Sequence, residues 1–276
     1  MGRDPLAWLR SPCVMGVVNI TPDSFSDGGE HLAARAARRT IDRMIHDGAV
    51  ILDMGAESTR PGAERVDADE QLRRLAPLFA DLVRRPPDVA LSIDTTRAAV
   101  AAAAIEAGAV LVNDVSAGRD DAQMFDVVAE RDVAVCLMHM RGQPRDMQDD
   151  PRYTDVVAEV VAFLEERIAV AVGAGIAETH ILVDPGLGFG KTLAHNLALL
   201  SGLERVRRLG RPVVVGLSRK GMVGLLTGRP IEGRLAGSLG GALAAVARGA
   251  DVIRAHDVGE TVDALRVWNA VAGGQA

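Results

Sequence analysis

The 276-residue sequence predicts an α/β fold, a single (β/α)8 TIM barrel at about residues 13–271 of one domain that spans residues 1–276. Three observations predict it. Eight short runs rich in Val, Ile and Leu alternate with longer segments of helical spacing. The runs are apolar at nearly every position, which is typical of parallel strands covered by helices on both faces. Each run ends in polar residues, and in a barrel all these ends meet at the C-terminal rim, where such enzymes place the active site.

The predicted strands follow one another along the whole chain. They are CVMGVV (13–18), AVILDM (49–54), VALSID (89–94), AVLVND (109–114), VAVCLM (133–138), HILVDP (180–185), PVVVGL (212–217) and ADVIRA (250–255). Helical spacing is clear at 31–48, which ends at a glycine suited to a helix C-terminus, and at 68–85. A doubly wound open sheet is the alternative. It would usually carry a glycine-rich dinucleotide turn after the first strand, where this chain has NITPDSF.

Composition narrows the class of protein. A hydrophobic content of 48% can bury a large core, and the net charge of −6 argues against nucleic acid or an anionic membrane as the main partner. The opening MGRDPLAWLR does not resemble a secretory signal, and no run approaches a membrane span, so we expect a cytoplasmic protein. Cys13 and Cys136 lie in apolar runs and are predicted to be buried free thiols.

One group of polar strand ends suits a flat heterocycle. Asp94, Asn113 and Asp184 end the third, fourth and sixth strands. A carboxylate there can accept two parallel hydrogen bonds from an amino group and a neighbouring ring N–H. The alternative for Asp94 is that it caps the helix that follows TTR.

A second group suits an anion. The eighth strand ends at Arg254 and His256 and the first ends at Asn19, and these strands are neighbours once a barrel closes. Arg and His would receive a phosphate group, and the Asn19 amide oxygen would complete the shell of a Mg²⁺ ion that keeps most of its waters. The alternative for Arg254 is an ordinary surface charge.

The segment DPGLGFGKT (184–192) nearly matches the phosphate-binding loop of NTPases. Pro185 stands at the first required glycine, however, and has no N–H to direct at a phosphate. We therefore interpret the glycines as allowing a heterocycle and a neighbouring loop to approach the backbone closely, with Phe189 available to cover the ligand.

Taken together, the motifs closely resemble those of the dihydropteroate synthases of the folate pathway. The matching segments, in order along nearly the whole chain, are MGVVNITPDSFSDGG, DMGAESTRPGAERV, SIDTTR, LVNDVSAG, MHMRGQPRDMQ, ILVDPGLGFGKT, VVVGLSRK and IRAHDVGET. The resemblance implies a transferase in which p-aminobenzoate displaces diphosphate from 6-hydroxymethyl-7,8-dihydropterin diphosphate, with Mg²⁺ as cofactor, through a dissociative step that forms a pterin cation.

The resemblance also implies roles for residues. The pterin would be bound by Asp94, Asn113, Met138, Asp184, Phe189 and Lys220. The diphosphate would be bound by Asn19, Thr59, Arg60, Arg254 and His256, with Asn19 also the metal ligand. The p-aminobenzoate would be bound by Phe25, Pro61, Lys220 and Gly221. The residues implied as catalytic are Asp27, Arg60, Lys220, Arg254 and His256.

The family further implies a homodimer, two mobile rim loops that close over the substrates, and sulfonamides as ligands of the p-aminobenzoate pocket. The sequence departs from the family at one position: many relatives have serine where this chain has Gly221. We therefore expect a raised KM for p-aminobenzoate. Two alternatives remain. A methyltetrahydrofolate-binding methyltransferase domain would not need NITPDSF, STRPG and SRK together, and a non-catalytic pterin-binding paralogue would be expected to have lost a loop residue or the Arg254–His256 pair.

Overall fold

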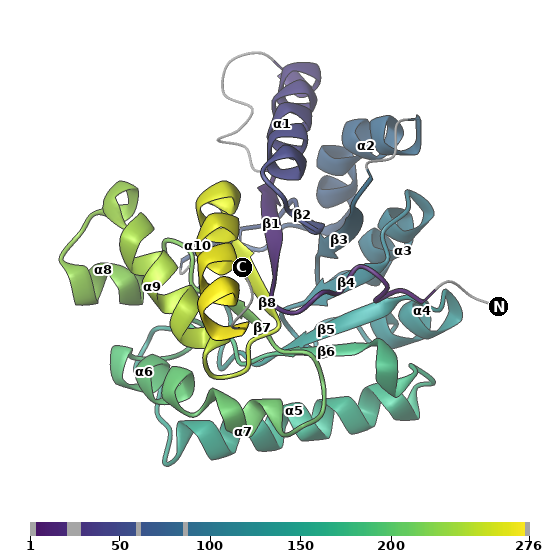
Figure 1. Ribbon diagram of the computed structural model, residues 1–276. Helices are drawn as coiled ribbons and strands as arrows, with labels where there is room; N and C mark the ends of the chain where they lie inside the picture. Colours follow the sequence, from purple (N-terminus) through teal and green to yellow (C-terminus); the bar gives the residue numbers. More distant parts are fainter. Residues whose placement is uncertain (1–3, 21–28, 59–61, 85–87, 274–276) are drawn as a thin grey trace.

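The computed structural model describes residues 4–20, 29–58, 62–84 and 88–273 and shows a parallel β-barrel surrounded by helices (Figure 1). In this described part the sheet has eight strands in the order β6-β5-β4-β3-β2-β1-β8-β7, and a parallel bridge between Val183 and Val213 joins its two edges. The strands are β1 (Cys13–Asn19), β2 (Ile51–Gly55), β3 (Ala90–Asp94), β4 (Leu111–Asp114), β5 (Ala134–Met138), β6 (Ile181–Asp184), β7 (Val214–Gly216) and β8 (Val252–Ala255).

Helices follow every strand and cover the outside of the barrel (Figure 1). They are α1 (Gly29–His46), α2 (Ala68–Arg84), α3 (Ala98–Glu106), α4 (Met124–Glu130), α5 (Val156–Gly173), α6 (Leu193–Ser201), α7 (Leu203–Arg207), α8 (Gly221–Thr227), α9 (Leu235–Val246) and α10 (Val258–Gly273), with short 3-10 helices at Glu178–His180 and Ile231–Gly233. Among the described residues, no helix has the length and apolar character needed to cross a membrane.

Alternate residues of each strand face opposite sides of the barrel wall. The inner side chains at the N-terminal ends of the strands form one apolar cluster: Cys13, Met15, Ile51, Leu111, Ala134, Cys136, Leu182, Val214 and Val252. Leu6, Trp8 and Leu9 pack against this cluster, so the segment before β1 closes that end of the barrel. The outer side chains and the helices form the larger core. The opposite, C-terminal end of the barrel is where inward-facing positions become polar.

The predicted fold is confirmed. Pairing of β1 with both β2 and β8 rules out the doubly wound alternative, because an open sheet of that kind would not join its first and last strands. The seventh strand is shorter than expected, with only residues 214–216 in the ladder. The helix expected at 68–85 is present as α2 although it contains Pro77. Cys13 and Cys136 are buried free thiols, as predicted.

Candidate active site at the barrel rim

The polar inward positions lie two residues or more beyond the inner apolar cluster. Because alternate strand residues share a face, Asn19, Asp94, Met138, Asp184 and Arg254 all continue the inner face of their strands. This common parity brings residues that are far apart in the sequence to one rim.

Asp53 of β2 lies at the centre of the rim and is completely buried. Its Oδ1 accepts a 2.6 Å hydrogen bond from Ser92 Oγ, and its Oδ2 accepts bonds from Asn113 Nδ2 at 2.9 Å and Arg254 Nε at 2.6 Å. The carboxylate is therefore paired with a cation and fully hydrogen-bonded, which a buried charge requires. It orients one residue of each expected group, Asn113 and Arg254.

Arg254 also donates from Nη2 to Asp94 Oδ2 at 2.7 Å. The two groups of rim residues expected from the sequence are therefore joined, since the arginine of the anion group is bonded to a carboxylate of the heterocycle group. Burial raises the pKa of Asp94 to about 7, against the lowering effect of Arg254. Asp94 does not cap the following helix, since the side-chain acceptor at the first turn of α3 is Asp121, whose Oδ2 accepts a 2.8 Å bond from Ala98 N. The capping alternative is therefore wrong.

Asn113 and Asp114 are consecutive but face opposite sides of β4. Asn113 shares the inner face of β4 with Leu111 and donates its amide N–H to Asp53, and its side-chain oxygen is an acceptor. Asp114 accepts three bonds from its own turn, from Ser116 N, Ser116 Oγ and Gly118 N at 2.7–2.8 Å. Asp114 thus shapes the loop after β4 and is not part of the site.

On β6, Asp184 Oδ1 accepts a 2.7 Å bond from Gly186 N, which fixes the carboxylate at the mouth of the glycine loop. Burial raises the pKa of Asp184, and the Lys220 ammonium opposes that shift. Lys220 follows β7, donates to the Leu187 carbonyl, and lies 4.5 Å from the centre of the Phe189 ring. Burial lowers the pKa of Lys220 to about 8. Asp184, Phe189 and Lys220 are therefore close together, as the sequence predicts.

An apolar wall stands beside these charges. Met138 packs with Val115, Met140 and Met147, which are all buried, and Phe189 lies against them half-buried. Thioether side chains are flexible and make favourable contacts with flat aromatic systems. The wall suits one face of a planar ring whose edge meets Asp94, Asn113 and Asp184.

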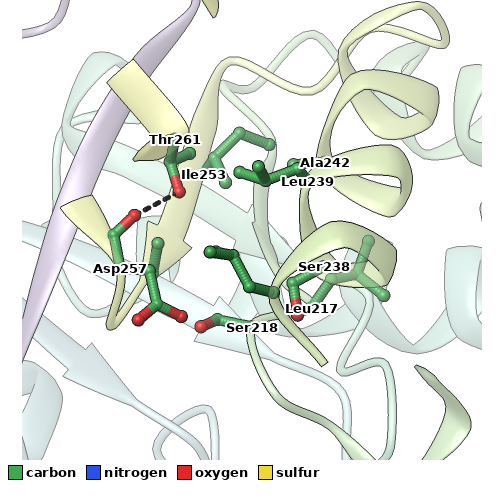
Figure 2. Close-up of a pocket in the computed structure, with 10 residues that line it drawn as sticks. Leu217, Ser218, Ser238, Leu239, Ala242, Ile253, Asp257 and Thr261 are labelled. Carbon is green, nitrogen blue, oxygen red and sulfur yellow. Dashed lines mark hydrogen bonds between the residues drawn. The ribbon is translucent and has the colours of Figure 1, made fainter. Parts of the chain in front are cut away.

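Ser218 positions His256 at the end of β8. Its Oγ accepts a 3.1 Å bond from His256 N and lies 3.1 Å from His256 Nδ1. Behind Ser218, a small pocket separates the barrel from α9 and α10 and is lined mainly by apolar side chains, with Thr261 Oγ1 bonded to the Asp257 carbonyl (Figure 2). Arg219 forms an ion pair with Asp257 on the same side. Asn19, at the end of β1, is exposed at the rim.

Five expected site residues lie outside the described residues: Phe25, Asp27, Thr59, Arg60 and Pro61. The described residues that flank the second loop are bonded to the barrel. Glu57 accepts bonds from Val66 N and Gln71 Nε2 at 3.2 and 3.0 Å, and Arg65 Nη1 donates to Thr96 Oγ1 at 3.1 Å. The segment that leaves β2 and the segment that enters α2 are therefore both fixed, close to the end of β3.

Asp53, Met140 and Met147 are rim residues that the sequence interpretation missed. For Asp53 a signal was available, because a carboxylate two positions after Ile51 in an apolar strand must share the inner face with it. Asp53 lies within the predicted strand 49–54, whereas the expected site residues lie where strands end. Met140 and Met147 follow β5 in a loop, where no periodicity indicates which side chains turn inward.

Comparison with known proteins identifies the family. Residues 15–256 match the model of the family described as pterin binding enzymes. A dihydropteroate synthase of Escherichia coli is 44% identical over 262 residues, covering 95% of this chain and 92% of that protein. A solved Xanthomonas albilineans dihydropteroate synthase with 4-aminobenzoic acid is 50% identical, covers 95% of this chain and 93% of its own, and has a TM-score of 0.88.

Two further solved structures have ligands in their titles. The X. albilineans enzyme in complex with 7,8-dihydropteroate is 48% identical with a TM-score of 0.85, covering 95% of this chain and 94% of its own. A Yersinia pestis dihydropteroate synthase in a sulfonamide drug complex is 43% identical with a TM-score of 0.89, covering 97% of this chain and 96% of its own. The chain belongs to the pterin binding enzymes and, within them, to the dihydropteroate synthases.

Proposed function

We propose that the chain catalyses the condensation of 6-hydroxymethyl-7,8-dihydropterin diphosphate with p-aminobenzoate, which gives 7,8-dihydropteroate and diphosphate. The observation that carries the proposal is the convergence of Asp94, Asn113, Asp184 and Lys220 beside an apolar methionine wall, in a chain of this family. The relatives with 4-aminobenzoic acid and 7,8-dihydropteroate support the choice of substrate and product.

The buried acceptors would hold the pterin by its edge. Asp184 Oδ1 accepts one bond from Gly186 N, and the carboxylate can still accept one bond on each oxygen, from the amino group and the adjacent ring N–H of a pterin. The Asn113 carbonyl oxygen and the Asp94 carboxylate supply further acceptors, while Lys220 supplies a donor to ring nitrogen or carbonyl oxygen. Met138 and Phe189 would cover the faces of the ring.

The basic residues at the neighbouring rim would bind the diphosphate. Arg254 lies in β8 and His256 directly follows that strand, and the proposal adds Asn19, Thr59 and Arg60. An exposed amide oxygen such as that of Asn19 fits a Mg²⁺ ion that is bound mainly by phosphate oxygens and water. Bound Mg²⁺ supplies charge neutralisation of the diphosphate leaving group.

The residues of this chain would then promote a dissociative reaction. Arg254, His256 and Arg60 stabilise negative charge as it grows on the departing diphosphate. The electron-rich dihydropterin would share the positive charge left on its methylene carbon. Asp27 lies near that carbon in the proposed arrangement, and the arylamine adds to it with little need for acid or base chemistry.

The p-aminobenzoate pocket is proposed at Phe25, Pro61, Lys220 and Gly221. The two apolar side chains would sandwich the aromatic ring, and the backbone N–H groups around Gly221 would attract its carboxylate. Sulfonamides, which mimic this substrate, are proposed to bind in the same pocket, a proposal supported by the Y. pestis complex.

A homodimer is the proposed assembly. Leu225 and Leu226 on α8 and Val267 and Val271 on α10 are large apolar side chains with more than half of their area exposed, which supports a protein partner at the helices of the C-terminal half. Sedimentation measurements test the assembly. The cytoplasmic location and the single domain over residues 1–276 stay predictions, tested by cell fractionation and limited proteolysis.

The decisive experiment mixes the purified protein with the pterin diphosphate, Mg²⁺ and p-aminobenzoate and measures diphosphate and dihydropteroate together. We expect equal amounts of both, lost without Mg²⁺ or in Lys220→Ala and Arg254→Ala. Tight binding of the pterin diphosphate without product would favour a non-catalytic paralogue. Binding of methyltetrahydrofolate alone would favour the methyltransferase alternative.

A further inference from the structure

Lysine is rare in this chain and is found at one place in the fold. Only two of the 31 basic residues, Lys191 and Lys220, are lysine, and all the others are arginine. Both lysines donate to backbone carbonyls of the same loop, which runs from Gly186 to Gly190 between β6 and α6. The active-site roles described above use Lys220 and leave Lys191 without one.

The loop is held through its carbonyl groups. Each of the five carbonyl oxygens from Gly186 to Gly190 accepts a hydrogen bond from a side chain. The donors, in order along the loop, are Lys191, Lys220, Gln148, Lys191 and Tyr153. Lys191 is the donor that acts twice, on the carbonyls of Gly186 and Phe189, and the Leu187 carbonyl bonded to Lys220 lies between these two in the sequence.

Lys191 is 3% exposed, and its Nζ is surrounded by acceptors. It lies 2.9 Å from the carbonyl oxygens of Gly186 and Phe189, 3.3 Å from that of His139, and 2.9 Å from His139 Nδ1. An ammonium group has three donors and no acceptor, whereas a neutral amine would direct its lone pair at one of these four acceptors. The cage therefore favours the charged form, although burial lowers the pKa of Lys191.

His139 completes the cage as a neutral acceptor. Its ring is 4% exposed and packs edge-on against Phe163, with ring centres 4.9 Å apart. Burial, with Lys191 as the next cause, lowers the pKa of His139 to about 2. The imidazole is therefore neutral, with its proton on Nε2 and the lone pair of Nδ1 directed at Lys191.

We propose that Lys191 is a positioning residue of the pterin site, whose buried ammonium fastens the Gly186–Gly190 loop to the end of β5 and so holds Phe189 and the Leu187 carbonyl against Lys220. The inference rests on the proposed function for its ligand. Without the two bonds from Lys191, the carbonyls of Gly186 and Phe189 would be released from the cage. Lys220 would then lose the fixed position from which it meets the pterin.

The cage is specific for lysine. An ammonium is a compact point charge with donors in several directions, whereas a guanidinium is a larger planar fork. The glycine loop and the segment after β5 also lie so close together that no side chain fits at two positions. A Cβ on Gly186 would lie 1.9 Å from the His139 carbonyl oxygen, and one on Gly190 would lie 2.2 Å from that of Arg141. We therefore expect that Lys191→Arg does not restore what Lys191→Met removes.

Binding measurements test the proposal. Calorimetric titration with 6-hydroxymethyl-7,8-dihydropterin diphosphate should show a Kd at least about tenfold higher for Lys191→Met than for the unchanged protein, with a larger change in KM for the pterin than in kcat. Tyr153→Phe is the matched control, because it removes one carbonyl bond at the outer end of the same loop, and its Kd should stay within about twofold. A folded Lys191→Met protein with unchanged Kd would overturn the proposal.

The rarity of lysine provides a second test. In protein labelled with [ε-¹³C]lysine, NMR should show two lysine signals, which the Lys191→Met or Lys191→Arg spectrum assigns. We expect Lys191 to be an ammonium at pH 7, and we expect the Lys220 signal to shift in the Lys191 variant. A neutral Lys191 at pH 7 would overturn the proposal. This result stands even where the unchanged protein fails to bind the pterin diphosphate, an outcome that would refute the proposed function instead.

If both Lys191 variants fail to fold, substitutions of His139 test the proposal instead. The two lysine NMR signals are then assigned from an alkaline pH titration of the unchanged protein. His139→Asn keeps an acceptor near the position of Nδ1, and His139→Leu removes it. The pterin Kd should be closer to that of the unchanged protein in the Asn variant than in the Leu variant. Equal Kd values in both variants and the unchanged protein would overturn the proposal.

Discussion

Asp53 and Arg254 are 201 residues apart in the chain, yet Arg254 Nε lies 2.6 Å from Asp53 Oδ2 at the centre of the barrel rim. Neither residue ends its strand, and the pair forms because β1 alone separates β2 from β8 in the closed sheet. The carboxylate sets the direction in which Arg254 presents the rest of its guanidinium to the site.

Asp53→Asn is expected to weaken both stability and activity. Removing one partner of a buried ion pair costs about 3 kcal/mol of unfolding free energy, and the arginine loses its orientation. We expect kcat/KM to fall by roughly a hundredfold, since small misplacements in an active site have effects of that size. Urea unfolding and steady-state kinetics measure the two effects.

Asp251→Asn is the matched control for that variant. Asp251 is also buried and charged, but it binds Val213 N at 2.8 Å and Arg207 near the closed end of the barrel. It should lose stability while kcat/KM stays within about twofold. Equal losses of kcat/KM in both variants would mean that Asp53 acts through stability alone.

Lys220 is expected to set the alkaline limit of activity. Its pKa is lowered to about 8 by burial, so the ammonium is lost as the pH rises above that value and kcat/KM should fall. Lys220→Arg should be slower, but its profile should stay flat to pH 10, because a guanidinium keeps its proton. An unchanged alkaline limb in the Arg variant would assign the limb to another group.

The same shift has a consequence for stability with the opposite sign. A lysine whose pKa is lower in the folded than in the unfolded chain opposes folding while it is charged, and this cost disappears between pH 8 and about 10.5. Lys220→Met should therefore raise the Tm at pH 7 while abolishing activity. The Tm difference should shrink as the pH rises from 8 to about 10.5, and a lower Tm at pH 7 would contradict this account.

Gly221→Ser is expected to lower the KM for p-aminobenzoate by about three- to tenfold, which corresponds to one typical hydrogen bond of about 1 kcal/mol. No atom lies within 4 Å of the position that a Cβ on Gly221 would take, so the serine fits at the start of α8. Gly240→Ser on α9 has equally open surroundings and serves as the control. An unchanged or higher KM in Gly221→Ser would refute the expectation that this glycine weakens p-aminobenzoate binding.

Gly186→Ala should disrupt the pterin site, whereas Gly210→Ala should not. Both glycines have a left-handed backbone, with φ of 67° and 71°, so the strain of adding a side chain, about 1 kcal/mol, is shared. Only at Gly186 does the new Cβ meet another backbone, whereas nothing lies within 4 Å at Gly210. Thermal unfolding and pterin titration of the pair separate the clash from the strain.

Asn19 is expected to affect the dependence on Mg²⁺. Asn19→Ala removes an oxygen ligand at the rim and should raise the Mg²⁺ concentration needed for half-maximal rate, while Asn19→Asp adds a negative charge and should lower it. The rate at saturating Mg²⁺ should change less than the half-saturating concentration. A half-saturating concentration that is the same in all three proteins would remove Asn19 from the metal site.

The barrel and most of its rim were predictable because strand residues alternate strictly. Asp94, Asp184 and Arg254 each continue the inner face of an apolar strand, and the parallel fold brings their ends together. The same alternation explains Asp114 and His139, which also follow apolar runs but face outward, since each comes directly after an inward residue.

Pairings across the barrel were not predictable. The bond between Arg254 and Asp94 joins residues on strands that are not neighbours, so no local pattern encodes it. Similarly, the cage around Lys191 needs the carbonyl oxygen and a ring nitrogen of His139. The contact between His139 and the glycine loop depends on how closely two glycines let these segments of the chain approach each other.

The segment containing Leu6, Trp8 and Leu9 seals the end of the barrel opposite the rim. Both substrates and both products of the proposed reaction must therefore enter and leave at the C-terminal rim of the barrel. The proposed pterin site lies among buried side chains, whereas Gly221, in the proposed p-aminobenzoate pocket, is exposed. For the proposed reaction this difference in depth predicts an order of binding: the pterin diphosphate binds first, p-aminobenzoate follows it, and the product must leave before another pterin can bind.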